Sequence, residues 1–145
     1  MEDTIWKKRI SLKKLNEMVD STLMRHLGIV FTKKGPDTLE ATMPVDARTH
    51  QEFGILSGGA NAALAETVAS IAGYLCCEGE EQVVGVGIQA NHLRAVRSGK
   101  VRAVCSPVKV GRTHQTWEIK IFTEQKKLCC LAHLTTYRIE SAQRV

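Results

Sequence analysis

The longest apolar stretch of the chain runs from Phe53 to Cys77 and contains one charged residue, Glu66. Two glycines at 58–59 mark the start of its helical part, and a Glu-Gly-Glu sequence at 78–80 marks its end. At 100° per residue, Glu66, Thr67 and Ser70 fall within one arc of about 100°, and nearly all other positions are apolar or small. The pattern predicts a mostly buried helix with a narrow polar stripe.

The segment before this helix predicts a shorter helix and a hairpin. Ser11 is suited to cap the first helix, because its side chain can accept a backbone N–H. The apolar positions of that helix recur at helical spacing: Leu12, Leu15, Val19 and Leu23. Residues 29–31 and 39–43 have the composition of strands, and Gly-Pro-Asp at 35–37 predicts the turn between them.

Beyond residue 82 the chain is rich in β-branched residues that alternate with polar ones. Strands are expected at 83–93, 100–105, 115–123 and 128–137. Gly85 and Gly87 predict a bulge or a close approach of a ligand to the backbone. One apolar helix followed by strands in meander order predicts an α+β fold, in which an antiparallel sheet curls around the helix. Open sheet edges would favour a dimer formed by edge pairing.

The length of 145 residues fits one domain, residues 1–145. The first residues, Met1 to Thr4, are acidic and polar, which does not match a signal peptide. The apolar stretch is poor in Leu, Ile and Val, and a charge at the centre of a membrane span costs about 2.5–3.5 kcal/mol. We therefore expect a soluble cytoplasmic protein with no membrane partner.

The formal net charge of +5 comes from basic residues spread along the chain, with few aromatic residues among them. This pattern suits a phosphate on a small ligand better than nucleic acid. The five cysteines, two adjacent pairs and Cys105, form neither a disulfide framework nor a zinc-ligand pattern, and none lies beside a histidine. We expect buried thiols, no metal and no bound cofactor.

The lone carboxylate of the apolar helix has two explanations. A buried charge is costly, so Glu66 needs either a hydrogen-bonding partner or a chemical role. On the pattern alone, a structural Glu66 and a catalytic one are equal alternatives.

Several stretches resemble the hotdog-fold thioesterases, in particular the PaaI-like group of small acyl-CoA and aryl-CoA hydrolases. The resemblance extends from about Ile5 to Thr136. Its most specific parts are residues 5–7, 39–46 with 48–49, 53–60 with 64–66, and 99–102 with Cys105. It implies a hotdog fold, with an antiparallel sheet wrapped around a long central α-helix. It also implies hydrolysis of a thioester of CoA or of an acyl-carrier protein by a homo-oligomer, a dimer of dimers.

The resemblance implies a role for each matching position on and before the central helix. Glu66 corresponds to the catalytic carboxylate, as nucleophile or as general base for water. Gly58 would present its backbone N–H to the thioester carbonyl oxygen, where the helix dipole favours the developing oxyanion. Gln51 would position the thioester or the attacking water, the alternative being an ordinary loop residue. Ser70, one turn after Glu66, would orient water or the acyl group, and a helix-packing serine is the equal alternative.

The same resemblance implies a coenzyme A site. Arg94, Lys109 and Arg112 would supply positive charge, and Gly111 would let backbone approach the pyrophosphate. His92 corresponds to a histidine near the substrate, although a lone histidine on a strand is often structural. The matching positions are Gly85, His92, Leu93, Arg94, Ala95, Lys109, Val110, Gly111, Arg112, Thr113 and His114. The alternative for each cation is a solvated surface charge.

One departure from the family pattern concerns catalysis. Where the family reads Leu-His-Gly-Gly, this chain reads Leu56-Ser57-Gly58-Gly59. Ser57 can donate a hydrogen bond to the thioester carbonyl, but it is shorter than histidine and cannot be cationic. Loss of one oxyanion-hole donor costs about 2.7–4 kcal/mol in a protease.

Three functions therefore compete. The first is a CoA thioesterase that uses Glu66, and the second is a protein that binds acyl-CoA with weakened catalysis because of Ser57. The third is a hotdog dehydratase or hydratase, which needs a histidine and acid pair, and no histidine lies near Glu66 in the sequence. The sequence does not name the acyl group.

Overall fold

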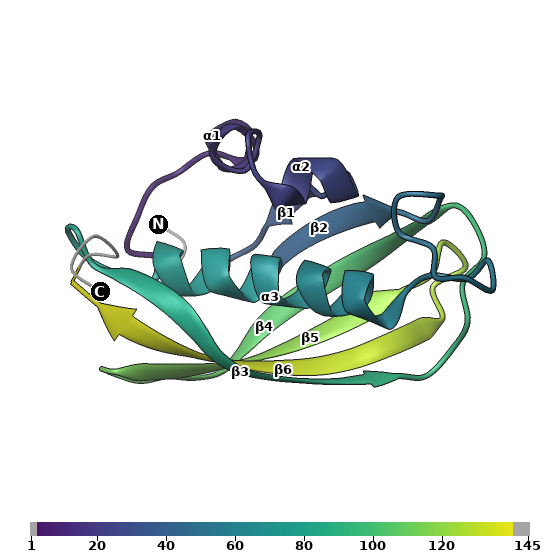
Figure 1. The fold of residues 1–145 in the computed structure, drawn as a ribbon. Coiled ribbons are helices and arrows are strands. Elements are labelled where there is room, and N and C mark those ends of the chain that lie inside the picture. The colour runs from purple at the N-terminus through teal and green to yellow at the C-terminus, as the bar shows by residue number, and fades with distance from the viewer. Residues whose placement is uncertain (1–2, 141–145) are drawn as a thin grey trace.

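Helix α3, Gly58–Leu75, lies across a curved six-stranded antiparallel sheet (Figure 1). The computed structural model describes residues 3–140, so Met1, Glu2 and residues 141–145 of the predicted domain lie outside the described residues. The other elements are α1 (Leu12–Met18), α2 (Leu23–Leu27), β1 (Val30–Lys34), β2 (Leu39–Pro44), β3 (Gln82–His92), β4 (Lys100–Val110), β5 (His114–Phe122) and β6 (Leu128–Ile139). The structure confirms the predicted α+β class and the sheet curled around the helix.

The strand order is β1-β2-β4-β5-β6-β3, so the predicted meander order is wrong. Strand β2 pairs with β4 from Leu39↔Cys105 to Pro44↔Lys100, and so takes the place beside β4 that a meander would give to β3. Strand β3 instead pairs with β6 at the other end of the sheet and forms an open edge. Its register shifts between Gly85 and Gly87, which confirms the predicted bulge.

The single N-terminal helix predicted from the apolar spacing is wrong, because the chain turns between α1 and α2. Val19 ends α1, and Thr22 starts α2 by accepting the Met24 N–H with its side-chain oxygen at 3.2 Å. Leu23 therefore belongs to a separate helix and is 58% exposed. The predicted cap at Ser11 is confirmed, since its Oγ accepts the Lys14 N–H at 3.2 Å.

The core lies between α3 and the concave face of the sheet. Strands β2, β4 and β5 alternate buried and partly exposed side chains, as expected for a sheet with one face packed against a helix.

All five cysteines are buried and free, which confirms the prediction of buried thiols. Burial raises the pKa of Cys76 and of Cys129 to about 11, so both thiols are protonated at neutral pH. Within residues 3–140, no helix is long and apolar enough to span a membrane.

A polar cluster in this core fixes the C-terminal half of α3. Gln115 is 1% exposed, and its side-chain Nε2 donates to the Gly73 carbonyl at 3.3 Å. Its Oε1 accepts hydrogen bonds from Thr136 Oγ1 at 2.9 Å and Trp117 Nε1 at 3.2 Å. A Cβ at position 73 would overlap Gln115 Oε1 and would lie 3.1 Å from Val83 Cγ2. The helix can approach the sheet here because residue 73 has no side chain.

We expect Gly73→Ala to lower the free energy of unfolding by about 1–3 kcal/mol, because the new methyl group overpacks this cluster. Urea denaturation at a fixed protein concentration measures the loss. The matched control is Gly59→Ala in the first turn of the same helix, where a Cβ would meet only Ser57 Oγ, at 3.5 Å. Equal stability of the two variants would contradict the role assigned to Gly73.

Candidate functional site

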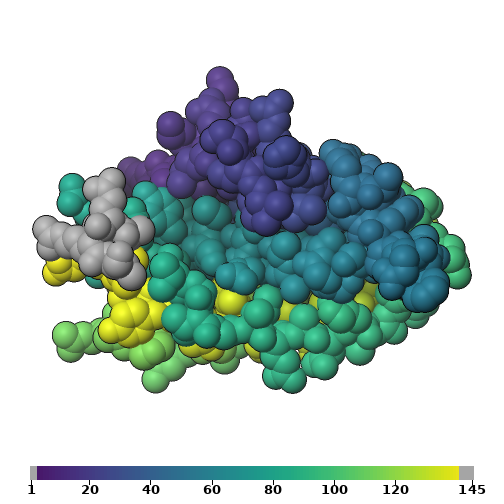
Figure 2. Space-filling model, in the orientation of Figure 1, coloured from purple at the N-terminus to yellow at the C-terminus, as the bar shows by residue number. Residues whose placement is uncertain are grey.

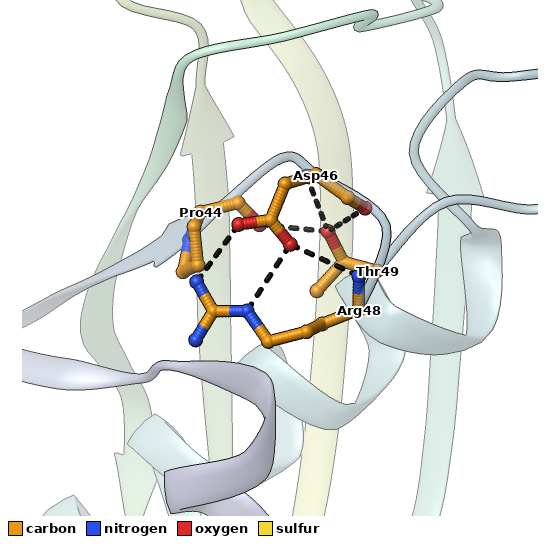
Figure 3. Close-up of polar contacts among 4 residues, drawn as sticks. All are labelled: Pro44, Asp46, Arg48 and Thr49. Carbon is orange, nitrogen blue, oxygen red and sulfur yellow. Dashed lines mark hydrogen bonds and ion pairs between the residues drawn. The ribbon is translucent and has the colours of Figure 1, made fainter.

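The loop that leads into α3 is held by a cluster of polar contacts (Figure 3). The Asp46 carboxylate accepts hydrogen bonds from the Arg48 backbone N–H at 3.0 Å and from the Arg48 guanidinium at 2.8 and 3.1 Å. These bonds hold the pKa of Asp46 at about 2, well below its usual range. Thr49 donates to the Pro44 carbonyl at 2.7 Å and accepts the Asp46 N–H at 3.2 Å. The loop is thus a defined support for Gln51, two residues further on.

Ser57 forms the N-terminal cap of α3. Its backbone N–H donates to the Thr49 carbonyl at 2.8 Å, and its Oγ accepts the Gly59 N–H at 3.1 Å. This cap satisfies one of the backbone N–H groups that a helix N-terminus leaves unpaired. This capping role of Ser57 was not predicted from the sequence. A contact between Ser57 and a thioester carbonyl stays a prediction.

A pocket of about 390 Å³ lies at this N-terminus. Its lining brings together six of the predicted site residues: Gln51, Gly58, His92, Leu93, Arg94 and Ala95. The His92 ring reaches the helix from the end of β3, since a Cβ at Gly58 would lie 2.9 Å from His92 Nε2. The Gln51 Oε1 accepts the Phe53 N–H, so the side chain is tied to its own turn. An imidazole, an amide and a helix N-terminus therefore surround one space, a combination suited to a carbonyl group that acquires negative charge.

Glu66 and Ser70 line a different pocket, of about 460 Å³, between α2 and α3. The premise that Glu66 is a buried carboxylate is wrong for this chain, because the residue is exposed. Its carboxylate lies beside the edge strand, where a Cβ at Gly85 would be 2.8 Å from Glu66 Oε2. Figure 2 shows α3 at the molecular surface between the N-terminal helices and the β3 edge. The polar stripe of the helix thus faces an uncovered side of the chain.

Within a single chain, Glu66 lies apart from the Gly58 pocket. The two residues are eight positions apart on α3, which places them about 12 Å apart along the helix axis. They also differ by roughly 80° around the axis. A small thioester group held at the Gly58 N–H is therefore out of reach of the same chain's Glu66 carboxylate.

The remaining predicted CoA contacts lie at the opposite end of the sheet from Arg94. His114 pairs with Tyr137, whereas His92 pairs with Cys130 on the same strand, a separation of about 23 Å at 3.3 Å per residue. In the turn between β4 and β5, a Cβ at Gly111 would lie 2.7 Å from the His114 carbonyl oxygen, so the turn itself requires glycine. The segment contains Lys109, Val110, Gly111, Arg112, Thr113 and His114, all exposed except the half-buried Gly111.

Sequence reasoning missed two parts of these pockets. Asn61 lines the Gly58 pocket and is 4% exposed, and its Oδ1 has no hydrogen-bonding partner among the described residues. Leu23 and Met24 of α2 line the Glu66 pocket. The available signal for Asn61 was a lone amide in the first half of an otherwise apolar helix. No signal indicated α2, because Leu23 was assigned to the longer first helix and residues 24–27 were assigned to no element.

Comparison with known proteins identifies the family. A family profile described as the thioesterase superfamily matches residues 53–130. The 1,4-dihydroxy-2-naphthoyl-CoA hydrolase of Escherichia coli is 54% identical over 132 residues, which cover 91% of this chain and 97% of that protein. The chain belongs to the thioesterase superfamily.

Further relatives of this thioesterase agree in both sequence and structure. The proofreading thioesterase EntH of Cronobacter sakazakii is also 54% identical, over 91% of this chain and 96% of that protein. Among solved structures, thioesterase HI1161 of Haemophilus influenzae matches with a TM-score of 0.92 and 51% identity, over 94% of this chain and 95% of the other. The predicted hotdog fold is confirmed, and the chain is a thioesterase of the hotdog family.

For this thioesterase we expect Ser57→Ala to lower the free energy of unfolding by about 1 kcal/mol, because the α3 cap is lost. The thermal midpoint should fall by about 2–4 °C for a chain of this size. Ser57→Asn is the matched control, since asparagine also caps helices and should keep the midpoint close to that of the wild type. An unchanged midpoint in Ser57→Ala would show that the cap does not stabilise the fold.

Proposed function

We propose that this thioesterase hydrolyses acyl-CoA or aryl-CoA thioesters with Glu66 as general base or nucleophile. The observation that carries the proposal is the convergence of Gln51, the Gly58 backbone and His92 on one pocket at the N-terminus of α3. The Gly58 N–H and the positive end of the helix dipole would stabilise the oxyanion of the tetrahedral intermediate. Gln51 would hold the thioester or the attacking water, and Ser70 would orient water or the acyl group beside Glu66.

The hydrolysis needs a carboxylate at the carbonyl carbon, and we propose that a second copy of the chain supplies it. Two copies related by a two-fold axis with α3 helices side by side and antiparallel would place Glu66 of each near the Gly58 pocket of the other. The open edge of β3 supports this pairing, because three apolar side chains stay exposed there: Val84, Val86 and Ile88. We further propose that such dimers pair into tetramers.

The same pairing gives a reason for the distribution of cations. Arg94 lies at the mouth of the Gly58 pocket, and Lys109 and Arg112 lie near the turn at the far end of the sheet. We propose that segments of both subunits bind one coenzyme A, with Arg94, Lys109 and Arg112 facing its phosphates. The name of the Escherichia coli relative includes a CoA ester, which supports this donor over an acyl-carrier protein.

We also propose that residues 1–145 form one domain and that the protein is located in the cytoplasm.

A second candidate function is binding of acyl-CoA with weakened turnover. It is favoured by Ser57, which stands where the family pattern has a histidine and whose oxygen accepts the Gly59 N–H as the cap of α3. Release of free thiol from a panel of aryl-CoA and alkyl-CoA esters separates the two functions. The protein's own buried and protonated thiols should contribute little background to this assay.

We expect Glu66→Gln to lower kcat by about 10²- to 10⁴-fold, because the isosteric amide cannot accept a proton or attack the carbonyl. Binding of the CoA ester, measured directly by calorimetry, should change little. Glu17→Gln on the exposed face of α1 is the matched control and should keep full activity. A Glu66→Gln enzyme with a wild-type kcat would refute the proposed mechanism.

The two-subunit site predicts complementation between two inactive variants. Gln51→Ala and Glu66→Gln damage different halves of the site, so a mixed dimer would contain one intact site. With random assembly, half of the dimers are mixed and the preparation should recover about a quarter of the wild-type activity. Co-expression with two affinity tags provides the mixed species. No recovery in purified mixed dimers would show that each site is built from one chain.

A further inference from the structure

The Asn61 side chain is a buried polar group of the Gly58 pocket. Asn61 lies three residues after Gly58, so both residues are on the same side of α3. It is 4% exposed, and its Oδ1 is buried without a hydrogen-bonding partner among the described residues. A buried acceptor without a partner destabilises a fold, and native proteins keep few of them. The side chain lines the pocket, so a group that enters the pocket is a candidate partner.

The free atom is an acceptor, and this restricts its partner to a hydrogen-bond donor. The thioester group itself carries acceptors only, the carbonyl oxygen and the sulfur. The donors that the substrate and the reaction would bring into this pocket are therefore the attacking water and the amide N–H groups of the pantetheine arm. Asn61 is nearly buried, whereas the neighbouring Leu93, Arg94 and Ala95 are exposed, so Asn61 lies away from the side on which an extended arm would enter.

We propose that Asn61 Oδ1 accepts a hydrogen bond from the attacking water; the inference rests on the proposed function. The amide can turn toward the pocket, because the second side-chain torsion of asparagine has a broad energy minimum. One O–H of the water would be held by Asn61, and the other proton would pass to Glu66 of the partner subunit as the water oxygen bonds to the carbonyl carbon. The C–S bond then breaks, and the departing thiolate takes the proton from Glu66. Where Glu66 acts as nucleophile instead, the same water hydrolyses the resulting anhydride.

A second asparagine provides a matched structural control. Asn16 of α1 uses both ends of its amide, since Nδ2 donates to the Phe31 carbonyl at 3.0 Å and Oδ1 accepts the Phe31 N–H at 2.7 Å. It joins α1 to β1 and does not line the Gly58 pocket. Removal of Asn16 should therefore weaken the fold without changing the chemistry.

The experiment compares Asn61→Ala, the near-isosteric Asn61→Leu and Asn16→Ala with the wild type. Thermal midpoints and steady-state kinetics are measured with benzoyl-CoA, or with whichever CoA ester of the panel the wild type hydrolyses. Both Asn61 variants should lose about 10- to 100-fold in kcat with little change in KM, because a positioned water matters only to the chemical step. Their midpoints should stay equal or rise, since a buried unpaired acceptor is removed. Asn16→Ala should show a lower midpoint and a wild-type kcat.

Substrates without pantetheine amides distinguish the two donors. An N-acetylcysteamine thioester keeps one amide N–H, and an alkyl thioester of the same acyl group has none. An equal fold-loss in kcat for the Asn61 variants on the CoA ester, the N-acetylcysteamine thioester and the alkyl thioester supports the water assignment. A loss that disappears with the alkyl thioester would overturn it in favour of a pantetheine contact. Asn61 variants with a wild-type kcat, or with a loss of kcat that accompanies a lowered thermal midpoint, would also overturn the water assignment. A wild-type protein that hydrolyses no ester of the panel would instead refute the proposed function.

Discussion

The close packing of α3 against the sheet sets the positions of the core and of the candidate site. The inner face of the helix carries small residues, with Ala65, Ala69 and Ala72 fully buried. Small side chains let the helix axis lie close to the larger side chains of the sheet, and the Gly73–Gln115 contact fixes the helix at one end. Because α3 is one continuous helix, this contact also fixes the positions of Gly58 and Glu66.

The N-terminus of α3 gathers groups from three separate parts of the chain. The loop around Asp46 positions Gln51, the cap at Ser57 fixes the first turn, and the end of β3 supplies His92. Unpaired N–H groups and the helix dipole make such a terminus favourable for negative charge. The absence of a side chain at Gly58 lets an imidazole lie directly against this terminus. The fold thus brings an imidazole, an amide and a helix N-terminus to one pocket.

Three departures from local consistency lie on α3 or on the neighbouring strand β3. Glu66 is exposed and forms no hydrogen bond or ion pair within residues 3–140, and the neighbouring β3 edge keeps apolar side chains exposed. Asn61, on the same helix, has a buried oxygen for which the described part of the chain provides no hydrogen-bonding partner. Such departures are expected where function or association requires them, since the sequence otherwise satisfies its own fold. They are the physical reason for proposing that a second copy of the chain completes the site.

Most local elements could be predicted from residue types and their spacing, whereas contacts between distant residues set how these elements meet. The start of α3 at Gly58, the cap of α1 at Ser11, the buried cysteines and the bulge between Gly85 and Gly87 follow from residue type, residue spacing and the conformational freedom of glycine. The edge position of β3, the break between α1 and α2, the exposure of Glu66 and the contact of His92 with Gly58 do not. Periodicity shows which face of an element is apolar, but it carries no information on which distant element covers that face. That choice depends on contacts between residues far apart in the chain, such as β2 against β4 and β3 against β6.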